Sequence, residues 1–137
     1  MELTLSHCFI PVLDQDAALR FYTDALDLEV RTDVTMDSMR WLTVGPRSQP
    51  DVEISLMPAA GPFVAPADRE TVEALVAKGA MYGVIFRTDD TDATFERIRA
   101  TGAEVLQEPI DQSYGVRDCA FRDPSGNHIR FSGPLAG

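Results

Sequence analysis

An internal repeat is the feature of this sequence that most constrains its fold. Two stretches share an opening Asp-x-Asp-Ala and a closing Glu-Val pair: "DQDAALRFYTDALDLEV" at residues 14–30 and "DDTDATFERIRATGAEV" at residues 89–105. The opening predicts the start of a helix, because an Asp side chain accepts hydrogen bonds from the free N–H groups there. A spacing of about 75 residues is too long for a solenoid repeat. The chain is therefore predicted to contain two related units.

Each unit has the pattern of a strand, a helix and three further strands. A Pro-, Gly- and Ala-rich segment at 58–66 separates the units and precedes a further predicted helix. We predict an α+β fold in which two βαβββ modules form one cupped mixed β-sheet. The predicted boundaries are a single domain at 1–137, a first module at 1–58, a linker loop and helix at 59–80, and a second module at 81–133. Strands are expected at 3–12, 39–44, 52–57, 82–87, 104–107, 117–122 and 128–132, with a further strand that starts at 28–30, and helices at 16–26, 67–78 and 89–101.

Composition excludes several classes of function. The chain has 137 residues, with 22 acidic against 12 basic side chains and a net charge of −10. That balance argues against nucleic acid as a partner. It mildly favours a cationic ligand, although a solvated acidic surface that keeps the protein soluble is the preferred explanation. No apolar run approaches the roughly 18 residues of a membrane span, and no signal peptide is recognisable. We therefore expect a cytoplasmic protein with no membrane partner, and reduced, buried thiols at Cys8 and Cys119.

Several motifs resemble those of a known family. They are "HCFIPVLD" at 7–14, Phe21-Tyr22, the strand–helix join at 86–95, "GAEV" at 102–105 and "FRDPSGNHIRF" at 121–131. With them the chain resembles the vicinal oxygen chelate superfamily, which includes glyoxalase I, bleomycin-resistance proteins and extradiol dioxygenases. The Asp-Pro-x-Gly turn before the last strand is the most specific of these motifs. The resemblance implies paired βαβββ modules around a cupped mixed sheet, usually in a homodimer.

The resemblance also implies a metal site with one ligand from each of four strands. The four positions match His7, Glu53, Val84 and Arg130. Val has no donor atom, and Arg is a permanent cation that cannot coordinate a divalent metal. We therefore expect no metal and no cofactor. A buried guanidinium needs an anionic partner, so the hypothesis is that a Glu53–Arg130 ion pair occupies the space where relatives hold a metal.

Five residues are candidates for ligand binding: His7, Trp41, Glu53, Tyr114 and Arg130. His7 is a cavity-lining hydrogen-bonding residue, a structural histidine or a metal ligand. Trp41, the single tryptophan, either stacks on a planar ligand or fills the core. Tyr114 lies in a loop that flanks the cleft in relatives, so a lid role is possible. Arg130 either pairs with a ligand carboxylate or phosphate or has a structural role. No catalytic residue is assigned.

The function expected from these observations is metal-independent binding of a small organic molecule, cationic or aromatic, in the cupped sheet, by a protein that resembles glyoxalase and bleomycin-resistance proteins. A homodimer is expected. The alternative is an enzyme of the glyoxalase or dioxygenase type, a lyase, isomerase or dioxygenase, either metal-free or with an incomplete metal site. The sequence has neither a Gly-rich phosphate loop nor a G-x-S-x-G nucleophile motif. It leaves open the ligand, any catalysis, and whether the pocket lies within one chain or between two.

Overall fold

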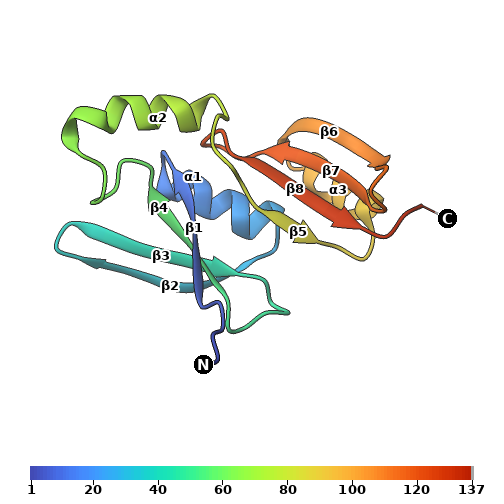
Figure 1. Cartoon of the computed structure of the whole chain (residues 1–137), viewed down its shortest axis with the longest axis horizontal. Coiled ribbons are helices and arrows are strands. Elements are labelled where there is room, and N and C mark those ends of the chain that lie inside the picture. Colours follow the sequence, from blue (N-terminus) through green and yellow to red (C-terminus); the bar gives the residue numbers. More distant parts are fainter. Residues whose placement is uncertain (137) are drawn as a thin grey trace.

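The computed structural model describes residues 1–136, which form two four-stranded sheets placed side by side (Figure 1). The first sheet has the strand order β1-β4-β3-β2 and the second has the order β5-β8-β7-β6. The elements are β1 (His7–Val12), α1 (Gln15–Arg20), the π-helical turn η1 (Phe21–Ala25), β2 (Glu29–Met36), β3 (Met39–Gly45), β4 (Glu53–Pro58), the 3₁₀ turn η2 (Pro66–Asp68), α2 (Arg69–Ala77), β5 (Ile85–Arg87), α3 (Thr91–Arg99), β6 (Glu104–Asp111), β7 (Arg117–Arg122) and β8 (His128–Gly133).

The two sheets are built on one plan. In the first, β1 pairs with β4 in parallel, and β4, β3 and β2 follow in antiparallel order. In the second, β5 pairs with β8 in parallel, and β8, β7 and β6 follow in antiparallel order. The predicted α+β fold with two βαβββ units is confirmed. Strand hydrogen bonds give two sheets rather than one continuous sheet, because β1 and β5 each pair only with a strand of their own sheet.

The repeated Asp-x-Asp-Ala motif starts a helix in both halves. Asp14 Oδ1 accepts a hydrogen bond of 3.0 Å from the backbone N–H of Ala17. Asp90 Oδ1 accepts a bond of the same length from the backbone N–H of Ala93. These caps satisfy donors that the first turn of a helix leaves free. The sequence repeat therefore reflects a shared way of starting the helix that covers each sheet.

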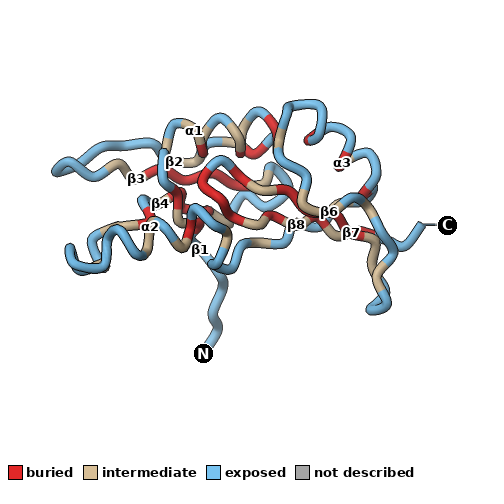
Figure 2. Tube along the Cα trace, turned by 90° about the horizontal axis from the view of Figure 1, so that it is seen from above, coloured by how far each residue is buried: buried red, intermediate tan, exposed pale blue. Residues whose placement is uncertain are grey.

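Helices α1 and α3 lie on the same side of the strands, and the buried residues lie beneath them (Figure 2). The alternation of β8 shows how one strand serves two faces, since Ile129 and Phe131 are buried whereas His128 and Arg130 remain partly exposed. Apolar side chains from both sheets and both helices form one core cluster. Burial of that cluster is the main force that holds α1 and α3 against the strands.

The first helix departs from its predicted form. Regular α-helix ends at Arg20, and the chain continues as η1, where the backbone N–H of Leu26 donates to the Phe21 carbonyl at 3.3 Å. This wider turn contains Tyr22, whose side chain is fully buried. Hydrophobic spacing alone does not distinguish an α-turn from a π-turn, so the sequence predicted one uninterrupted helix.

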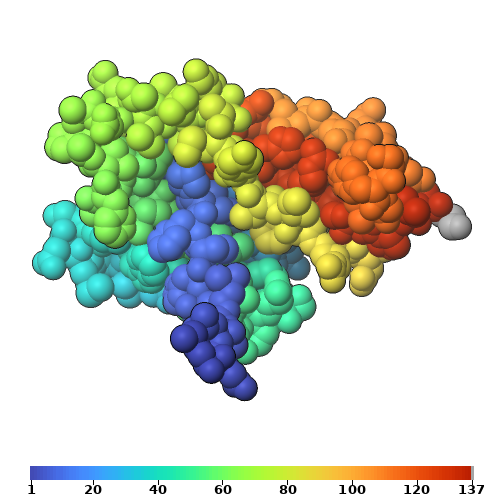
Figure 3. All heavy atoms as spheres, in the orientation of Figure 1, coloured from blue at the N-terminus to red at the C-terminus, as the bar shows by residue number. Residues whose placement is uncertain are grey.

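The turn at 123–127 joins the second half of the chain to the first (Figure 3 shows the two halves in contact). Asp123 Oδ1 accepts hydrogen bonds from the backbone N–H groups of Ser125, Gly126 and Asn127. Ser125 Oγ accepts from the backbone N–H of Leu13, and Asn127 Nδ2 donates to the Pro11 carbonyl. The motif is therefore a connection between the sheets as well as a turn before β8.

No helix within residues 1–136 is both long and apolar enough to cross a membrane.

Candidate functional site

A histidine–carboxylate pair lies at the start of the first sheet. His7 and Glu53 face each other in the parallel register of β1 and β4. His7 Nε2 is 3.2 Å from Glu53 Oε2, and the Thr43 hydroxyl donates to Glu53 Oε1 at 2.7 Å. Both side chains of the pair are partly open to solvent. The Glu53 carboxylate is thus fixed by its neighbours and remains accessible to a ligand.

Three aromatic rings adjoin one another beside this pair. The Trp41 ring centroid is 6.0 Å from that of His7 and 6.3 Å from that of Phe9. The Phe9–Trp41 contact is edge-to-face, and Phe9 is 56% exposed. Aromatic rings in such arrangements bind planar molecules by offset stacking or edge contacts. The structure therefore brings together on the first sheet three of the residues predicted to bind a ligand, His7, Trp41 and Glu53.

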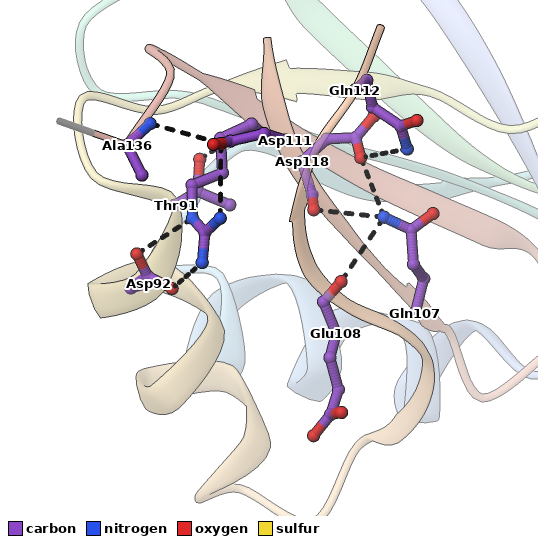
Figure 4. A network of polar contacts seen from close by, with 9 residues as sticks. Thr91, Asp92, Gln107, Glu108, Asp111, Gln112, Asp118 and Ala136 are labelled. Atoms are coloured by element: carbon purple, nitrogen blue, oxygen red, sulfur yellow. Dashed lines mark hydrogen bonds and ion pairs between the residues drawn. The ribbon is translucent and has the colours of Figure 1, made fainter.

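A second polar cluster is centred on Asp118 in β7. Its side chain is only 1% exposed and forms a 3.0 Å ion pair between Oδ2 and Arg130 Nη1. Gln107 Nε2 and Gln112 Nε2 each donate to Asp118 Oδ1 at 2.8 Å (Figure 4). The Tyr114 hydroxyl donates to Oδ2 at 3.1 Å. Arg130 also donates to Gln107 Oε1 at 3.0 Å, so these five side chains form a connected network.

This network determines the protonation of Asp118. Burial by itself would raise the pKa of the carboxyl group. Hydrogen bonds from Gln112, Gln107 and Tyr114, together with the charge of Arg130, outweigh burial and leave the pKa below its ordinary value. Asp118 is therefore ionised at neutral pH, and its charge is matched by the guanidinium of Arg130.

The neighbouring His128 lies on the same face of β8 as Arg130. Its Nε2 is 3.1 Å from Arg130 Nη2. Burial and the charges of Arg130 and Arg122 lower the pKa of His128 below its usual value. The imidazole is therefore neutral at pH 7, and it adds a hydrogen-bonding group rather than a charge to this surface.

The predicted Glu53–Arg130 ion pair is wrong within the chain. Glu53 pairs with His7 on the first sheet, whereas Arg130 pairs with Asp118 on the second. The physical reason is proximity, because β7 is hydrogen-bonded to β8 and brings a buried carboxylate within reach of Arg130. Arg130 has an anionic partner, as its charge requires, but that partner is Asp118 rather than Glu53.

The residue at the position of the third metal ligand also differs from the prediction, because Ile85 rather than Val84 has the register position in β5 that His7 has in β1. Val84 packs against the hydrophobic core. Its neighbour Ile85 lies opposite Arg130 in the parallel register, as His7 lies opposite Glu53, and is exposed. Neither Val84 nor Ile85 has a donor atom.

The donor set does not fit the four-ligand metal site that the family resemblance implies. His7 and Glu53 supply two donors, but Arg130 is a cation held by Asp118. Within residues 1–136, no group of three or more His, Cys, Asp or Glu side chains is arranged to hold a metal ion. These four positions therefore supply only two of the four ligands that such a metal site requires.

Asp118, Gln107 and Gln112 were not predicted from the sequence. One signal could have identified Asp118, since it precedes the apolar run Cys119-Ala120-Phe121 within a strand. A carboxylate is seldom fully buried unless it is paired or well hydrogen-bonded, so a polar network could have been expected at this position. The glutamines have no comparable signal, because their role depends on the register between β6 and β7.

Comparison with known proteins places this geometry in a family. Residues 4–131 match the Glyoxalase/Bleomycin resistance protein/Dioxygenase superfamily, and the chain belongs to it. The crystal structure of UcmS2 is similar, with 40% identity, a TM-score of 0.89, and coverage of 96% of this chain and 98% of that one. TnmS3, an antibiotic binding protein from Streptomyces sp. CB03234, shares 28% identity with a TM-score of 0.76, and 98% of each chain is covered. The uncharacterized protein YurT of Bacillus subtilis (strain 168) is 30% identical over 95% of this chain and 97% of that protein.

Proposed function

We propose that this protein binds a small organic molecule, of the kind that antibiotic-binding relatives take, without a metal ion. The observation that carries the proposal is the surface of His7, Phe9 and Trp41 beside the Glu53 carboxylate. Such a surface suits a flat aromatic body, and the carboxylate suits a cationic group on it. The similarity to TnmS3, an antibiotic binding protein, supports the same ligand class.

We also propose that a homodimer completes the binding pocket. The His7–Glu53 cluster lies on the first sheet and the Asp118–Arg130 cluster on the second, and no hydrogen bond or ion pair joins them within residues 1–136. Large apolar side chains remain exposed on both halves: Phe9, Phe63, Tyr82, Ile85 and Tyr114. A second copy would cover such side chains and would bring the first sheet of one chain to the second sheet of the other. Tyr114, which is 67% exposed, would then flank the pocket mouth.

We further propose that the chain is a single domain, with one module at 1–58 and another at 81–133, joined by the segment 59–80. A cytoplasmic location is supported by the two free thiols, since Cys119 is fully buried and Cys8 half-buried.

A metal-free enzyme is the second candidate, and the His7–Glu53 pair favours it. A carboxylate that orients an imidazole at 3.2 Å is an arrangement that general bases use. An enzyme of this kind would change its ligand chemically, whereas a binding protein would release it unchanged.

In the experiment, a panel of aromatic antibiotics is titrated into the purified protein, and the fluorescence of Trp41 is measured at each step. Trp41 is the single tryptophan, so quenching reports the proposed pocket directly. Mass spectrometry of each ligand after prolonged incubation separates binding from turnover. We expect saturable quenching by a member of the panel and recovery of that ligand intact. A modified product would favour the enzyme, and saturable binding that leaves Trp41 unaffected would contradict the proposed pocket.

Sedimentation analysis tests the dimer. We expect a dimer for the wild type and a monomer for Ile85→Glu, because a charge on that exposed apolar position would be desolvated in the interface. A monomeric wild type that still binds ligand at Trp41 would place the whole pocket within one chain.

A further inference from the structure

A small apolar pocket adjoins the aromatic surface of the first sheet, at the end away from Glu53. It has a volume of about 200 Å³ and is formed by the last residues of β1 and β4 together with the loop that follows β4. Its walls include Phe9, Pro11, Met57 and Val64, and each residue that lines it is apolar or glycine. An apolar cavity of about 150 Å³ is large enough to bind benzene, so this pocket can hold one apolar group of a ligand.

The pocket and the His7–Glu53 pair lie on the same face of the first sheet. In the parallel register of β1 and β4, His7 lies opposite Glu53 and Pro11 lies opposite Met57. Alternate residues of a strand point to the same side, so these two pairs share one face. Ile10, which precedes Pro11, points the other way and is buried in the hydrophobic core. The shared face is therefore the one that α1 and α3 leave uncovered.

Phe9 connects the charged end of this face to its apolar end. Its ring contacts that of Trp41 edge-to-face, at a centroid distance of 6.3 Å, and it also forms a wall of the pocket. A strand rises by about 3.3 Å per residue, so the step of four residues from His7 to Pro11 separates the two ends by about 13 Å. Along β1 the face thus presents a carboxylate, then aromatic rings, then an apolar pocket.

We propose that this face selects an elongated ligand with one cationic end and one uncharged apolar end. The cationic group would lie at Glu53, a flat aromatic body over Phe9 and Trp41, and the apolar group in the pocket beside Met57. This inference rests on the function proposed above and specifies the shape of its ligand. A carboxylate attracts an ammonium group through charge-assisted hydrogen bonds, whereas a pocket without polar partners excludes a charge. A ligand that is charged at both ends should therefore bind poorly.

The test uses three probes that share an ammonium group on a biphenyl body and differ only at the far end. They are 4-phenylbenzylamine, 4-(4-tert-butylphenyl)benzylamine, and the analogue that carries a carboxylate in place of the tert-butyl group. Each probe is titrated calorimetrically into the purified full-length protein, and quenching of Trp41 fluorescence reports that it binds at the aromatic surface.

Three variants separate the two ends of the face. Met57→Gln places an amide of similar size in the pocket. Met81→Gln is the matched control, because Met81 is 43% exposed and does not line the pocket. Glu53→Gln reports on the charged end. The comparison of the three probes in the wild type stands even where a variant fails to fold.

We expect the tert-butyl probe to bind about tenfold more tightly than 4-phenylbenzylamine, because the pocket buries an additional aliphatic group. The carboxylate probe should bind more weakly than either. Met57→Gln should weaken the tert-butyl probe by about fivefold relative to 4-phenylbenzylamine, because the ligand would then bury an amide without a hydrogen-bond partner. Met81→Gln should change neither affinity, and Glu53→Gln should weaken both ammonium probes by the same factor.

The proposal is overturned if the tert-butyl group adds no affinity, if the carboxylate probe binds as tightly as the tert-butyl probe, or if Met81→Gln reduces the gain as much as Met57→Gln does. Each of these outcomes leaves the proposed function intact as long as 4-phenylbenzylamine quenches Trp41 and depends on Glu53. If neither ammonium probe binds, or if both bind without any effect on Trp41, the function proposed above is wrong and this inference fails with it.

Discussion

The hydroxyl of Tyr22 donates a 2.7 Å hydrogen bond to Asp123 Oδ2, and this bond joins the two halves of the chain across 101 residues of sequence. Both residues are buried. Burial and the adjacent Asp123 carboxylate raise the pKa of Tyr22 well above its ordinary value, so the phenol stays protonated and remains a donor. The π-helical turn that carries Tyr22 and the Asp-Pro-Ser-Gly-Asn turn that carries Asp123 are thus parts of one contact.

Tyr22→Phe removes this donor without changing the ring. The free energy of unfolding should fall by about 1–3 kcal/mol, because a buried carboxylate oxygen loses a hydrogen-bond partner. Urea unfolding measures the change. Tyr82→Phe is the control, because it removes the same hydroxyl group and keeps the aromatic ring at a side chain that is 99% exposed within one chain, so the midpoint should be unchanged. An equal loss in both variants would contradict a role for the Tyr22–Asp123 bond.

Arg130 and Asp118 should be coupled energetically. Arg130→Gln leaves the buried Asp118 carboxylate without its counter-charge, so it should destabilise the fold by about 1–3 kcal/mol. Adding Asp118→Asn removes the charge that had lost its partner. The double variant should therefore be less destabilised than the sum of the two single variants. Unfolding of all four proteins gives the coupling, and strict additivity would mean that the ion pair contributes no stability.

Asp118 should also make the free energy of unfolding depend on pH in the acidic range. The pKa of the Asp118 carboxyl group is lowered in the folded state. Its contribution to the free energy of unfolding is therefore complete above the pKa of the unfolded state, which is about 4, and is lost as the pH falls through the pKa of the folded state. We expect the unfolding free energy of the wild type to fall more steeply below pH ~4 than that of Asp118→Asn. Denaturant unfolding across this range measures both slopes. Parallel curves would show that Asp118 titrates alike in the folded and unfolded states.

Most of the fold could be predicted from the sequence because the signals that specify helices and strands are local. The caps at Asp14 and Asp90 and the alternation of β8 each depend on a few neighbouring residues, and they appear in the structure as expected. The extent of β1 was overestimated, since residues 3–6 have a strand-like composition but lie outside the sheet. Pairing with β4 starts at His7, and the sequence of one strand does not reveal where its partner begins.

The candidate site was predicted less well because it depends on contacts between distant segments. His7, Trp41 and Glu53 lie together on the first sheet, whereas the sequence predicted Arg130 as the partner of Glu53. The partner of Arg130 is Asp118, which lies on the adjacent strand, and the choice between Asp118 and Glu53 rests on how the two sheets are placed. The hydrophobic periodicity of the sequence carries no information about that placement. The role of Tyr22 was missed for the same reason, since its partner lies 101 residues away.

Gly83 should be among the glycines least tolerant of substitution. A Cβ atom at this position would overlap the backbone carbonyl of His128, which cannot move without disturbing β8. Gly83→Ala should cost about 1–3 kcal/mol or more, as overpacked core positions do. Gly102→Ala is a contrasting variant, because nothing lies within 4 Å of its Cβ position and only its positive φ of 90° opposes the change. Thermal unfolding of both variants should show the larger loss for Gly83→Ala.

In the proposed pocket, Glu53 should contribute to affinity only for a positively charged ligand. Glu53→Gln should weaken the binding of a cationic aromatic ligand by about fivefold, because the lost ion pair is partly exposed. It should leave the binding of an uncharged aromatic ligand of similar shape unaffected.

Asp51→Asn is the matched control. It removes the same charge from an exposed position two residues away and leaves the contacts of Glu53 with His7 and Thr43 in place. Trp41 fluorescence titrations of the three proteins with both ligands measure the effect. Equal weakening by Asp51→Asn would assign the preference to the net charge of the protein, and equal weakening of the uncharged ligand would show that Glu53 acts by holding His7 rather than by its charge.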